Sequence, residues 1–357
     1  MAKAKEIDQV YVPAWGYSYG KKTLRRIEST LRAIKNAGSS GIYLIGLWDS
    51  DCDNGFGIVD YQVNPAFGTT DEYKSLIETA HGLGLWVGVD VVPNHVSRNN
   101  FLAHNCLTGA PGFEDALYVV SKEEAEQLTK AGVPSFFGKL AYSDFGDKYV
   151  RSTFVDHGQL NVNWESEVVR MYFKQVFEKL KSDGIDFVRV DCGPLLLEDV
   201  TKADPNNPFA CMRPKESLEA IRKVSGDMLL FVEWFNKKSA YLFNGLKNCR
   251  ALRCDHVVTG EFDVSDLQEN EVVVLGGHDR MPLADAVSPE EFDKIVKIAE
   301  GQEFVFKDLQ TRLKWMTIAA ILPGDEKHDA DLKNPNQRFR ARRPIAPVRR
   351  AFLKQFS

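Results

Sequence analysis

An acidic residue and an arginine stand together at the end of a short apolar run. The run Ile185–Val190 contains Arg189 and is followed by Asp191. Because side chains alternate faces along a strand, Arg189 and Asp191 share a face, and the guanidinium would hold the carboxylate ionised. This pair favours a nucleophilic carboxylate. An Asp that closes a strand is as often a helix cap, so the motif alone leaves both interpretations open.

Two further acidic residues occupy comparable places. Glu233 ends the apolar run Leu229–Val232, and Asp279 follows the run Val272–Leu275. An apolar setting disfavours ionisation of a carboxyl and suits a general acid, whereas the structural alternative is a buried glutamate paired with an arginine. A retaining glycosidase uses two carboxyls about 5 Å apart. Three acidic run ends in one chain therefore favour glycoside chemistry.

The elements that must position these residues follow an alternating pattern. Apolar runs rich in β-branched residues alternate with longer amphipathic stretches, which predicts an α/β fold with parallel strands covered by helices. In a (β/α)8 TIM barrel, the catalytic groups lie at the carboxyl ends of several strands. The expected strands are 9–13, 41–47, 85–92, 185–191, 228–233 and 272–275, and the expected helices are 22–36, 71–83, 168–181, 216–224 and 289–299.

One segment interrupts this pattern. Residues 94–156 are rich in Gly, Phe, Asn and Ser, and they form a segment too long for a plain connection between a strand and a helix. We therefore expect a small inserted subdomain (subdomain B) at 94–156, after the third strand. Residues 1–93 and 157–357 would then form the catalytic barrel.

Composition limits the classes of partner. The 357 residues are 44% hydrophobic and 27% charged with a net charge of −5, so we expect one large globular domain and no nucleic-acid partner. No apolar stretch is long enough for a membrane span, and the start lacks the apolar core of a signal peptide, which predicts a cytoplasmic protein. The six cysteines show no zinc-like spacing and are expected to be reduced and non-ligating.

The acid-bearing segments resemble the four short motifs of the α-amylase superfamily, glycoside hydrolase family 13. In chain order they are Asp90-Val-Val-Pro-Asn-His95, Gly184-Ile-Asp-Phe-Val-Arg-Val-Asp191, Phe231-Val-Glu233 and His278-Asp279. The resemblance covers nearly the whole chain. It implies a (β/α)8 barrel that carries a retaining glycosidase site.

The resemblance also implies a role for each motif residue. Asp191 would be the nucleophile that forms a covalent β-glucosyl-enzyme, Glu233 the acid/base, and Asp279 the group that stabilises the transition state. The residues that would hold the sugar and the nucleophile in subsite −1 are His95, Arg189 and His278. Without the other motifs, His95 would more often be a loop histidine with its hydrogen bonds satisfied.

A fifth segment is similar to an element of oligo-1,6-glucosidases, α-glucosidases and sucrose-acting relatives. It reads Asp53-Asn54-Gly55-Phe56, with Phe56 in place of the usual Tyr. The similarity implies that Asp53 grips the terminal glucose and that Phe56 stacks under the sugar. Arg342 would be the partner of Asp53, and the pair would close the pocket. Exo action on short sucrose-, maltose- or isomaltose-type substrates would follow.

The sequence departs from the family near its end. Relatives carry an apolar strand between a Pro-Gly and a Gly-Asp-Glu element, whereas Ile321–Glu326 runs directly from one to the other. We therefore expect either that 316–322 forms the eighth strand or that the barrel closes imperfectly near Arg342. The family's C-terminal β-sandwich is not expected, so the chain resembles a trimmed form.

No cofactor or metal is expected. The segment Ala14–Tyr19 lacks the Asp-Asn-Asp loop that binds calcium in many relatives, and Asn94 alone does not make a calcium site. The aromatic residues of this segment could line the pocket mouth or serve packing.

Several functions remain open at this point. The expected partner is a small oligosaccharide or disaccharide. The alternatives to an exo-acting α-glucoside hydrolase or transglucosidase are an endo-α-amylase, a sucrose phosphorylase-like transglucosylase and a catalytically silent family 13 scaffold. The strand-end residues do not separate hydrolysis, transfer and phosphorolysis, because all three share the first half-reaction.

Overall fold

The structure is a computed structural model of the chain. It describes residues 5–52, 55–132, 134–135, 138–139, 141–152, 158–202, 204, 210–234, 242–253, 271–275 and 304–308.

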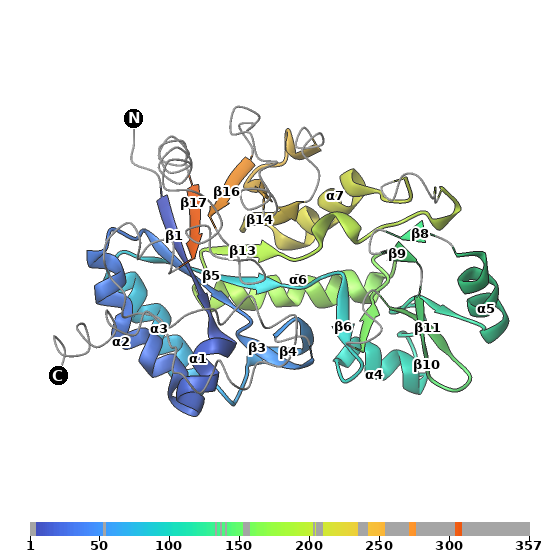
Figure 1. Cartoon of the computed structure of the whole chain (residues 1–357), viewed down its shortest axis with the longest axis horizontal. Coiled ribbons are helices and arrows are strands. Elements are labelled where there is room, and N and C mark those ends of the chain that lie inside the picture. The colour runs from blue at the N-terminus through green and yellow to red at the C-terminus, as the bar shows by residue number, and fades with distance from the viewer. Residues whose placement is uncertain are drawn as a thin grey trace, which may run out of the picture.

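Eight described strands form a closed parallel barrel, which confirms the predicted (β/α)8 fold (Figure 1). Each strand pairs with the next in chain order, and the last pairs with the first, so that Lys5 lies opposite Phe304. The barrel strands are β1 (Lys5–Tyr11), β2 (Gly41–Ile45), β5 (Trp86–Val91), β13 (Phe187–Val190), β14 (Leu229–Trp234), β15 (Cys249–Arg253), β16 (Glu271–Leu275) and β17 (Phe304–Asp308).

Amphipathic helices cover the outside of the barrel. In α2, the buried residues Ile27, Leu31 and Ile34 recur at helical spacing and form one apolar stripe. Helix α3 begins with a capping box in which Thr69 and Glu72 satisfy each other's backbone N–H groups. The helices are α1 (Val12–Tyr19), α2 (Thr23–Asn36), α3 (Thr70–Gly82), α6 (Glu167–Ser182) and α7 (Pro214–Ser225), with the short 3-10 turns η1 (Gly20–Lys22), η4 (Gly193–Leu195) and η5 (Val200–Lys202).

The segment between β5 and α6 lies outside the barrel. Figure 1 shows α2 and α3 on one side of the molecule and α4, α5, β10 and β11 on the other. The segment comprises β6 (His95–Ser97), α4 (Phe101–Thr108), β7 (Val119–Val120), α5 (Lys122–Ala131), β8 (Pro134–Ser135), β9 (Gly138–Lys139), β10 (Ala141–Asp144), β11 (Tyr149–Ser152) and β12 (Gln159–Asn161). Strands β10, β11 and β7 form a sheet of their own, and β12 pairs with β6. The domain limits at 94 and 156 stay a prediction.

The end of the barrel differs from the sequence expectation. Strand β17 occupies the place between β16 and β1 and closes the barrel, so the eighth strand is 304–308 where 316–322 or an imperfect closure was expected. Residues 316–322 and Arg342 lie outside the described residues. The apolar part of β17 is short, because Lys307 and Asp308 follow at once. The sequence pattern also does not predict strand β15, because arginines interrupt its apolar pattern although Cys249 and Ala251 are buried.

The first strand is another correction. It ends at Tyr11, and the next residues form α1 where part of a strand and a loop were expected. Trp15 is buried and packs against Tyr19 with ring centres 5.8 Å apart, whereas Tyr17 is exposed. Trp15 therefore serves packing.

A layer of aromatic side chains fills the barrel interior on the side of the amino ends of the strands. The rings of Phe187 and Phe231 lie 5.8 and 4.9 Å from that of Phe306, and Tyr43 meets Phe306 at 5.9 Å. Gly88 makes room for this layer, because a Cβ at this position would lie 2.0 Å from the Phe187 ring. The next inward-facing residues along these strands, two positions on, lie one layer nearer the carboxyl ends.

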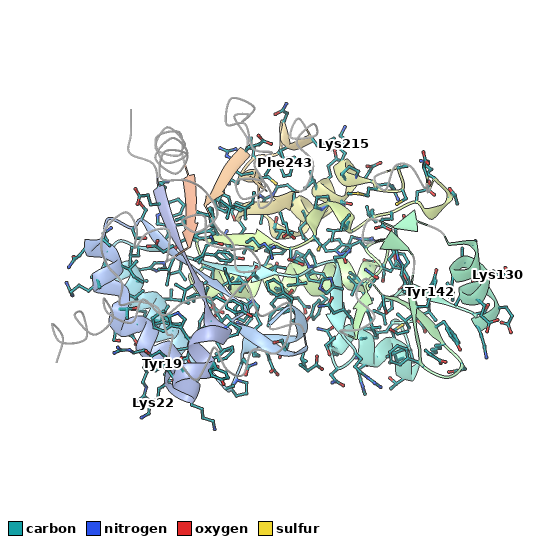
Figure 2. The ribbon with its side chains drawn as sticks, in the orientation of Figure 1. Tyr19, Lys22, Lys130, Tyr142, Lys215 and Phe243 are labelled. Atoms are coloured by element: carbon teal, nitrogen blue, oxygen red, sulfur yellow. The ribbon has the colours of Figure 1, made fainter. Side chains whose placement is uncertain are left out.

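Many charged side chains lie on the surface of the molecule. Figure 2 shows Lys22, Lys130 and Lys215 directed outward, and all three are exposed. Among the helices that the structure describes, none is long and apolar enough to cross a membrane.

Candidate active site

Charged residues occupy the layer above the aromatic rings. Asp90 lies two positions after Gly88, Arg189 two after Phe187, and Glu233 two after Phe231. Asp191 follows directly after β13, and its backbone N–H donates to the Val91 carbonyl at 2.9 Å. The strand period therefore brings four charged side chains together at the carboxyl ends of β5, β13 and β14.

Arg189 connects the three carboxylates. Its Nη1 donates to Asp191 Oδ1 at 2.5 Å and to Asp90 Oδ1 at 3.1 Å, while Nη2 donates to Glu233 Oε1 at 2.5 Å. Only 3% of Arg189 is exposed to solvent. Burial opposes its charge, but the neighbouring carboxylates, first Glu233 and then Asp191, hold the pKa of the guanidinium well above its ordinary value. One buried cation therefore holds Asp191 and Glu233 near each other.

A second contact orients Glu233. Its Oε2 accepts a hydrogen bond from the Cys192 backbone N–H at 3.1 Å. Cys192 adopts a left-handed conformation (φ 48°), which turns the chain from β13 into η4. Gly193 permits this turn, because a Cβ there would lie 2.5 Å from a methyl group of Val232. The pairing of Glu233 with an arginine matches the structural alternative raised from the sequence.

His95 lies beside the nucleophile candidate at the start of β6. Its Nδ1 is 3.2 Å from Asn94 Oδ1, and Asn94 Nδ2 donates to the Leu195 carbonyl at 2.8 Å. A ring nitrogen of His95, an Asp191 oxygen and the Cys192 sulfur all lie within 4.8 Å of one another. His95 is therefore in the same cluster as Asp191.

Phe56 reaches the cluster from the hairpin of β3 (Trp48–Cys52) and β4 (Gly57–Val63). The guanidinium carbon of Arg189 lies 5.6 Å from the centre of the Phe56 ring, a cation–π contact. Only 5% of Phe56 is exposed. The structure thus places Phe56 at the site, and its stacking under a sugar stays a prediction.

Asp90 is a site residue to which the sequence reasoning gave no role of its own. Its Oδ1 accepts a hydrogen bond from the Tyr43 hydroxyl, and its Oδ2 accepts one from the Gly46 N–H at 3.3 Å. Burial is the main cause that raises the pKa of Asp90 to about 6, and Arg189 and Tyr43 oppose this rise. The sequence feature that could have identified Asp90 as a site residue is its position on the third expected strand, two residues after Gly88.

Four predicted site residues lie outside the described residues: Asp53, His278, Asp279 and Arg342. Their roles remain predictions from the sequence.

The sequence matches the model of a known protein family. The family model "Alpha amylase, catalytic domain" matches residues 13–247, which is more than half of the chain. The chain belongs to the α-amylase family.

Relatives in the α-amylase family differ in their activities. The probable oligo-1,6-glucosidase 3 of Bacillus subtilis is 30% identical over 174 residues, which are 47% of this chain and 31% of that protein. The sucrose 6(F)-phosphate phosphorylase of Ilumatobacter coccineus is 26% identical over 220 residues, which are 52% of this chain and 41% of that protein. This α-amylase-family chain spans less than half the length of the curated relatives that it matches.

A solved structure supports the fold. The trehalose-6-phosphate hydrolase of Bacillus licheniformis matches with a TM-score of 0.73 at 19% identity, over 99% of this chain and 70% of that one. At this identity the likeness shows the barrel and carries no argument about substrate.

Asp90 predicts a pH dependence of stability in this α-amylase-family barrel. The folded pKa of Asp90, about 6, exceeds the unfolded value near 4, so the native state binds the proton more tightly. We expect the contribution of Asp90 to the free energy of unfolding to decrease as the pH rises from about 4 to about 6. Urea unfolding of the wild type and of Asp90→Asn across this range tests this. The free energy of unfolding of Asp90→Asn minus that of the wild type should increase up to pH about 6 and then stay constant. Parallel pH profiles would contradict it.

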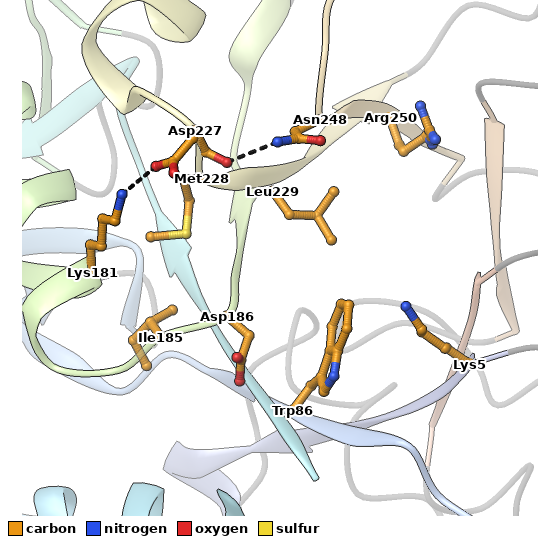
Figure 3. Close-up of a pocket in the computed structure, with 10 residues that line it drawn as sticks. All are labelled: Lys5, Trp86, Lys181, Ile185, Asp186, Asp227, Met228, Leu229, Asn248 and Arg250. Atoms are coloured by element: carbon orange, nitrogen blue, oxygen red, sulfur yellow. Dashed lines mark hydrogen bonds and ion pairs between the residues drawn. The ribbon is translucent and has the colours of Figure 1, made fainter. Parts of the chain in front are cut away.

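A pocket of about 420 Å³ lies at the opposite end of the barrel, at the amino ends of β1, β5, β13, β14 and β15 (Figure 3). Lys5 Nζ lies 3.9 Å from the centre of the Trp86 ring, and Lys181 pairs with Asp227 at 2.5 Å. Asp186 accepts a hydrogen bond from the Val87 N–H at 2.8 Å. These side chains lie at the amino ends of the strands, away from Asp191 and Glu233 at the carboxyl ends. The pocket is therefore not the candidate active site.

Proposed function

We propose that the chain is a retaining enzyme that hydrolyses or transfers the terminal glucosyl unit of short α-glucosides. The observation that carries this proposal is the bridge from Arg189 to both Asp191 and Glu233 at the carboxyl ends of neighbouring barrel strands. A retaining mechanism needs two carboxyl groups that lie about 5 Å apart. One guanidinium that binds both groups supports such a separation.

Each residue has one role in this mechanism. Asp191 attacks the anomeric carbon while Glu233 gives a proton to the leaving-group oxygen, and a covalent β-glucosyl-enzyme forms. Glu233 then takes a proton from water, or from a sugar hydroxyl, which attacks the same carbon and releases Asp191. Before the first step, the substrate must draw Glu233 away from Arg189, because a general acid has to carry its proton.

The remaining predicted residues would complete the pocket. His95 and Arg189 hold the sugar and the nucleophile in subsite −1, and Asp279 and His278 act at the same sugar. Asp53 and Arg342 close the far end, while Phe56 lines the pocket. A closed pocket admits a disaccharide or short oligosaccharide and excludes an endo-α-amylase reaction on long chains. A cytoplasmic location remains part of the proposal.

Phosphorolysis is the second candidate function. Similarity to a sucrose 6(F)-phosphate phosphorylase favours it, because phosphate can attack the glucosyl-enzyme in place of water. The silent scaffold is the alternative of another class, and the buried charges around Arg189 speak against it. A scaffold would not need three buried carboxylates on one cation, since burying charge costs stability.

Product analysis tests the function. The protein is incubated with sucrose, maltose, isomaltose, trehalose 6-phosphate and p-nitrophenyl α-glucoside, each with and without inorganic phosphate. Release of glucose or a glucosylated acceptor supports hydrolysis or transfer, and glucose 1-phosphate that appears only with phosphate supports phosphorolysis. Rapid loss of viscosity of a starch solution would overturn exo action. No turnover of any substrate would favour the scaffold.

Glu233→Gln tests the assignment of the acid/base. Loss of a general acid costs about 10²–10⁴ in rate, and the loss is greatest when the leaving group is poor. We expect kcat/KM for maltose to fall by that amount and kcat/KM for p-nitrophenyl α-glucoside to fall much less, since nitrophenolate leaves without a proton. Initial rates on both substrates provide the measurement.

The matched control is Glu165→Gln, which removes an exposed carboxylate that pairs with Arg213 at 2.9 Å. It should leave both rates near those of the wild type. Equal losses on the two substrates in Glu233→Gln would contradict the acid/base role.

A further inference from the structure

The cluster around Asp191 contains three side chains with metal-binding chemistry, and the proposed reaction does not use one of them, Cys192. His95, Asp191 and Cys192 are buried, and one possible ligand atom from each lies within 4.8 Å of the other two. Imidazole nitrogen, thiolate sulfur and carboxylate oxygen are the three ligand types that Zn²⁺ binds in proteins. Cys192 has none of the catalytic roles assigned above, and its backbone N–H donates to Glu233.

We propose that His95, Asp191 and Cys192 form a binding site for a thiophilic divalent cation such as Zn²⁺, at the catalytic centre. Bonds of about 2.0–2.3 Å place the ligand atoms of tetrahedral Zn²⁺ about 3.5 Å apart, so small side-chain movements bring three atoms that lie within 4.8 Å of one another to this spacing. The cation takes the thiolate form of Cys192, and the thiol proton goes to solvent. The fourth position stays open to water.

The local charge favours a cation. Asp90, Asp191 and Glu233 face one cation, Arg189, within a buried cluster. The described part of the cluster therefore has an excess of negative charge, and a divalent cation reduces that excess at close range. The same excess suits the positive charge that develops on a sugar in the proposed reaction.

The ligands are also held in place before a cation arrives. The Asp191 N–H bond to Val91 and the Cys192 N–H bond to Glu233 fix the turn that carries two ligands. Asn94 Oδ1 lies 3.2 Å from Nδ1 of His95, a contact that helps to orient the imidazole ring. Thiolate and imidazole ligands favour Zn²⁺ over the oxygen-seeking Ca²⁺ and Mg²⁺.

Inhibition is the functional consequence, and it rests on the proposed function. A cation bound to Asp191 occupies the nucleophile and the space of the sugar. We therefore expect Zn²⁺ to inhibit glucoside turnover competitively, because cation and substrate need the same carboxylate.

Direct metal binding tests the site independently of turnover. Metal-free protein is titrated with Co²⁺, whose bond to a thiolate gives a charge-transfer absorption band, and with Zn²⁺ by calorimetry. The wild type should show the band, and Cys192→Ser should lose it and bind Zn²⁺ at least about tenfold more weakly. Cys106→Ser is the matched control, since Cys106 is also buried but lies in α4. It should bind as the wild type does.

Each outcome separates the site from the function. Absence of the band in the wild type, or equal Zn²⁺ affinity in Cys192→Ser and the wild type, would overturn the site. Cys192→Ala provides a second variant, and circular dichroism shows which of the two is folded. If Co²⁺ binds through Cys192 but the metal-free protein turns over no glucoside, the site stands and the proposed function fails. If glucosides are turned over without metal binding, the site fails alone.

Discussion

Replacing Asp191 with asparagine should reduce kcat for p-nitrophenyl α-glucoside by about four to six orders of magnitude, the usual cost of removing a catalytic nucleophile. Asparagine has nearly the same shape but cannot form the covalent glucosyl-enzyme. Arg189 would also lose an ionic partner at 2.5 Å. Stopped assays with long incubation measure the residual rate, and mass spectrometry of protein quenched during turnover detects the covalent adduct in the wild type alone.

Asp227→Asn is the matched control for this variant. Asp227 is an exposed acid at the amino end of β14, where it pairs with Lys181. It should retain the wild-type rate and the adduct. Mass spectrometry that maps the trapped sugar to Glu233 would exchange the two roles, and an Asp191→Asn rate within tenfold of the wild type would remove Asp191 from the chemistry.

The second large effect concerns stability and centres on Arg189. Methionine at this position keeps an unbranched chain but leaves Asp90, Asp191 and Glu233 together in a buried site without their cation. Removing one partner of a buried ion pair typically costs about 3–5 kcal/mol. We expect Arg189→Met to lower the free energy of unfolding by at least this amount at neutral pH, as measured by urea denaturation.

Two further variants make this result specific. Arg189→Lys keeps the charge but lacks the planar fork that reaches several carboxylates, so it should cost less than Arg189→Met. Arg213→Met removes a surface arginine that pairs with Glu165, and exposed pairs contribute about 0–1 kcal/mol. If Arg189→Met and Arg213→Met were equally stable, the charge cluster would not be a stabilising feature of the barrel.

Much of the fold follows from local sequence pattern. Five barrel strands stand out as apolar runs, because parallel strands are buried on both faces. The first strand, expected at 9–13, lies at Lys5–Tyr11 and begins with charged residues. Strands β15 and β17 do not stand out, since each carries charged residues within or directly after its buried positions. Barrel closure decides their place, and closure depends on partners far away in the chain.

The local sequence likewise predicts some contacts in the site and not others. The spacing of Arg189 and Asp191 predicts a shared face, and the structure brings them into contact. The hydrogen bond between Tyr43 and Asp90, and the approach of His95 to Cys192, join residues on different strands and loops. No local pattern contains such distances, so these partners became visible only in three dimensions.

The pairing of β1 with β17 has a consequence for how the chain folds during synthesis. Lys5 finds its partner Phe304 only after nearly all of the barrel has been made. Until then, β1 offers an unpaired edge, and such edges recruit strands from other chains. Because contacts between distant segments form slowly, we expect ring closure to be the late step of folding and aggregation to compete with it. A nascent chain that ends before residue 304 should therefore depend on chaperones more than the full chain does.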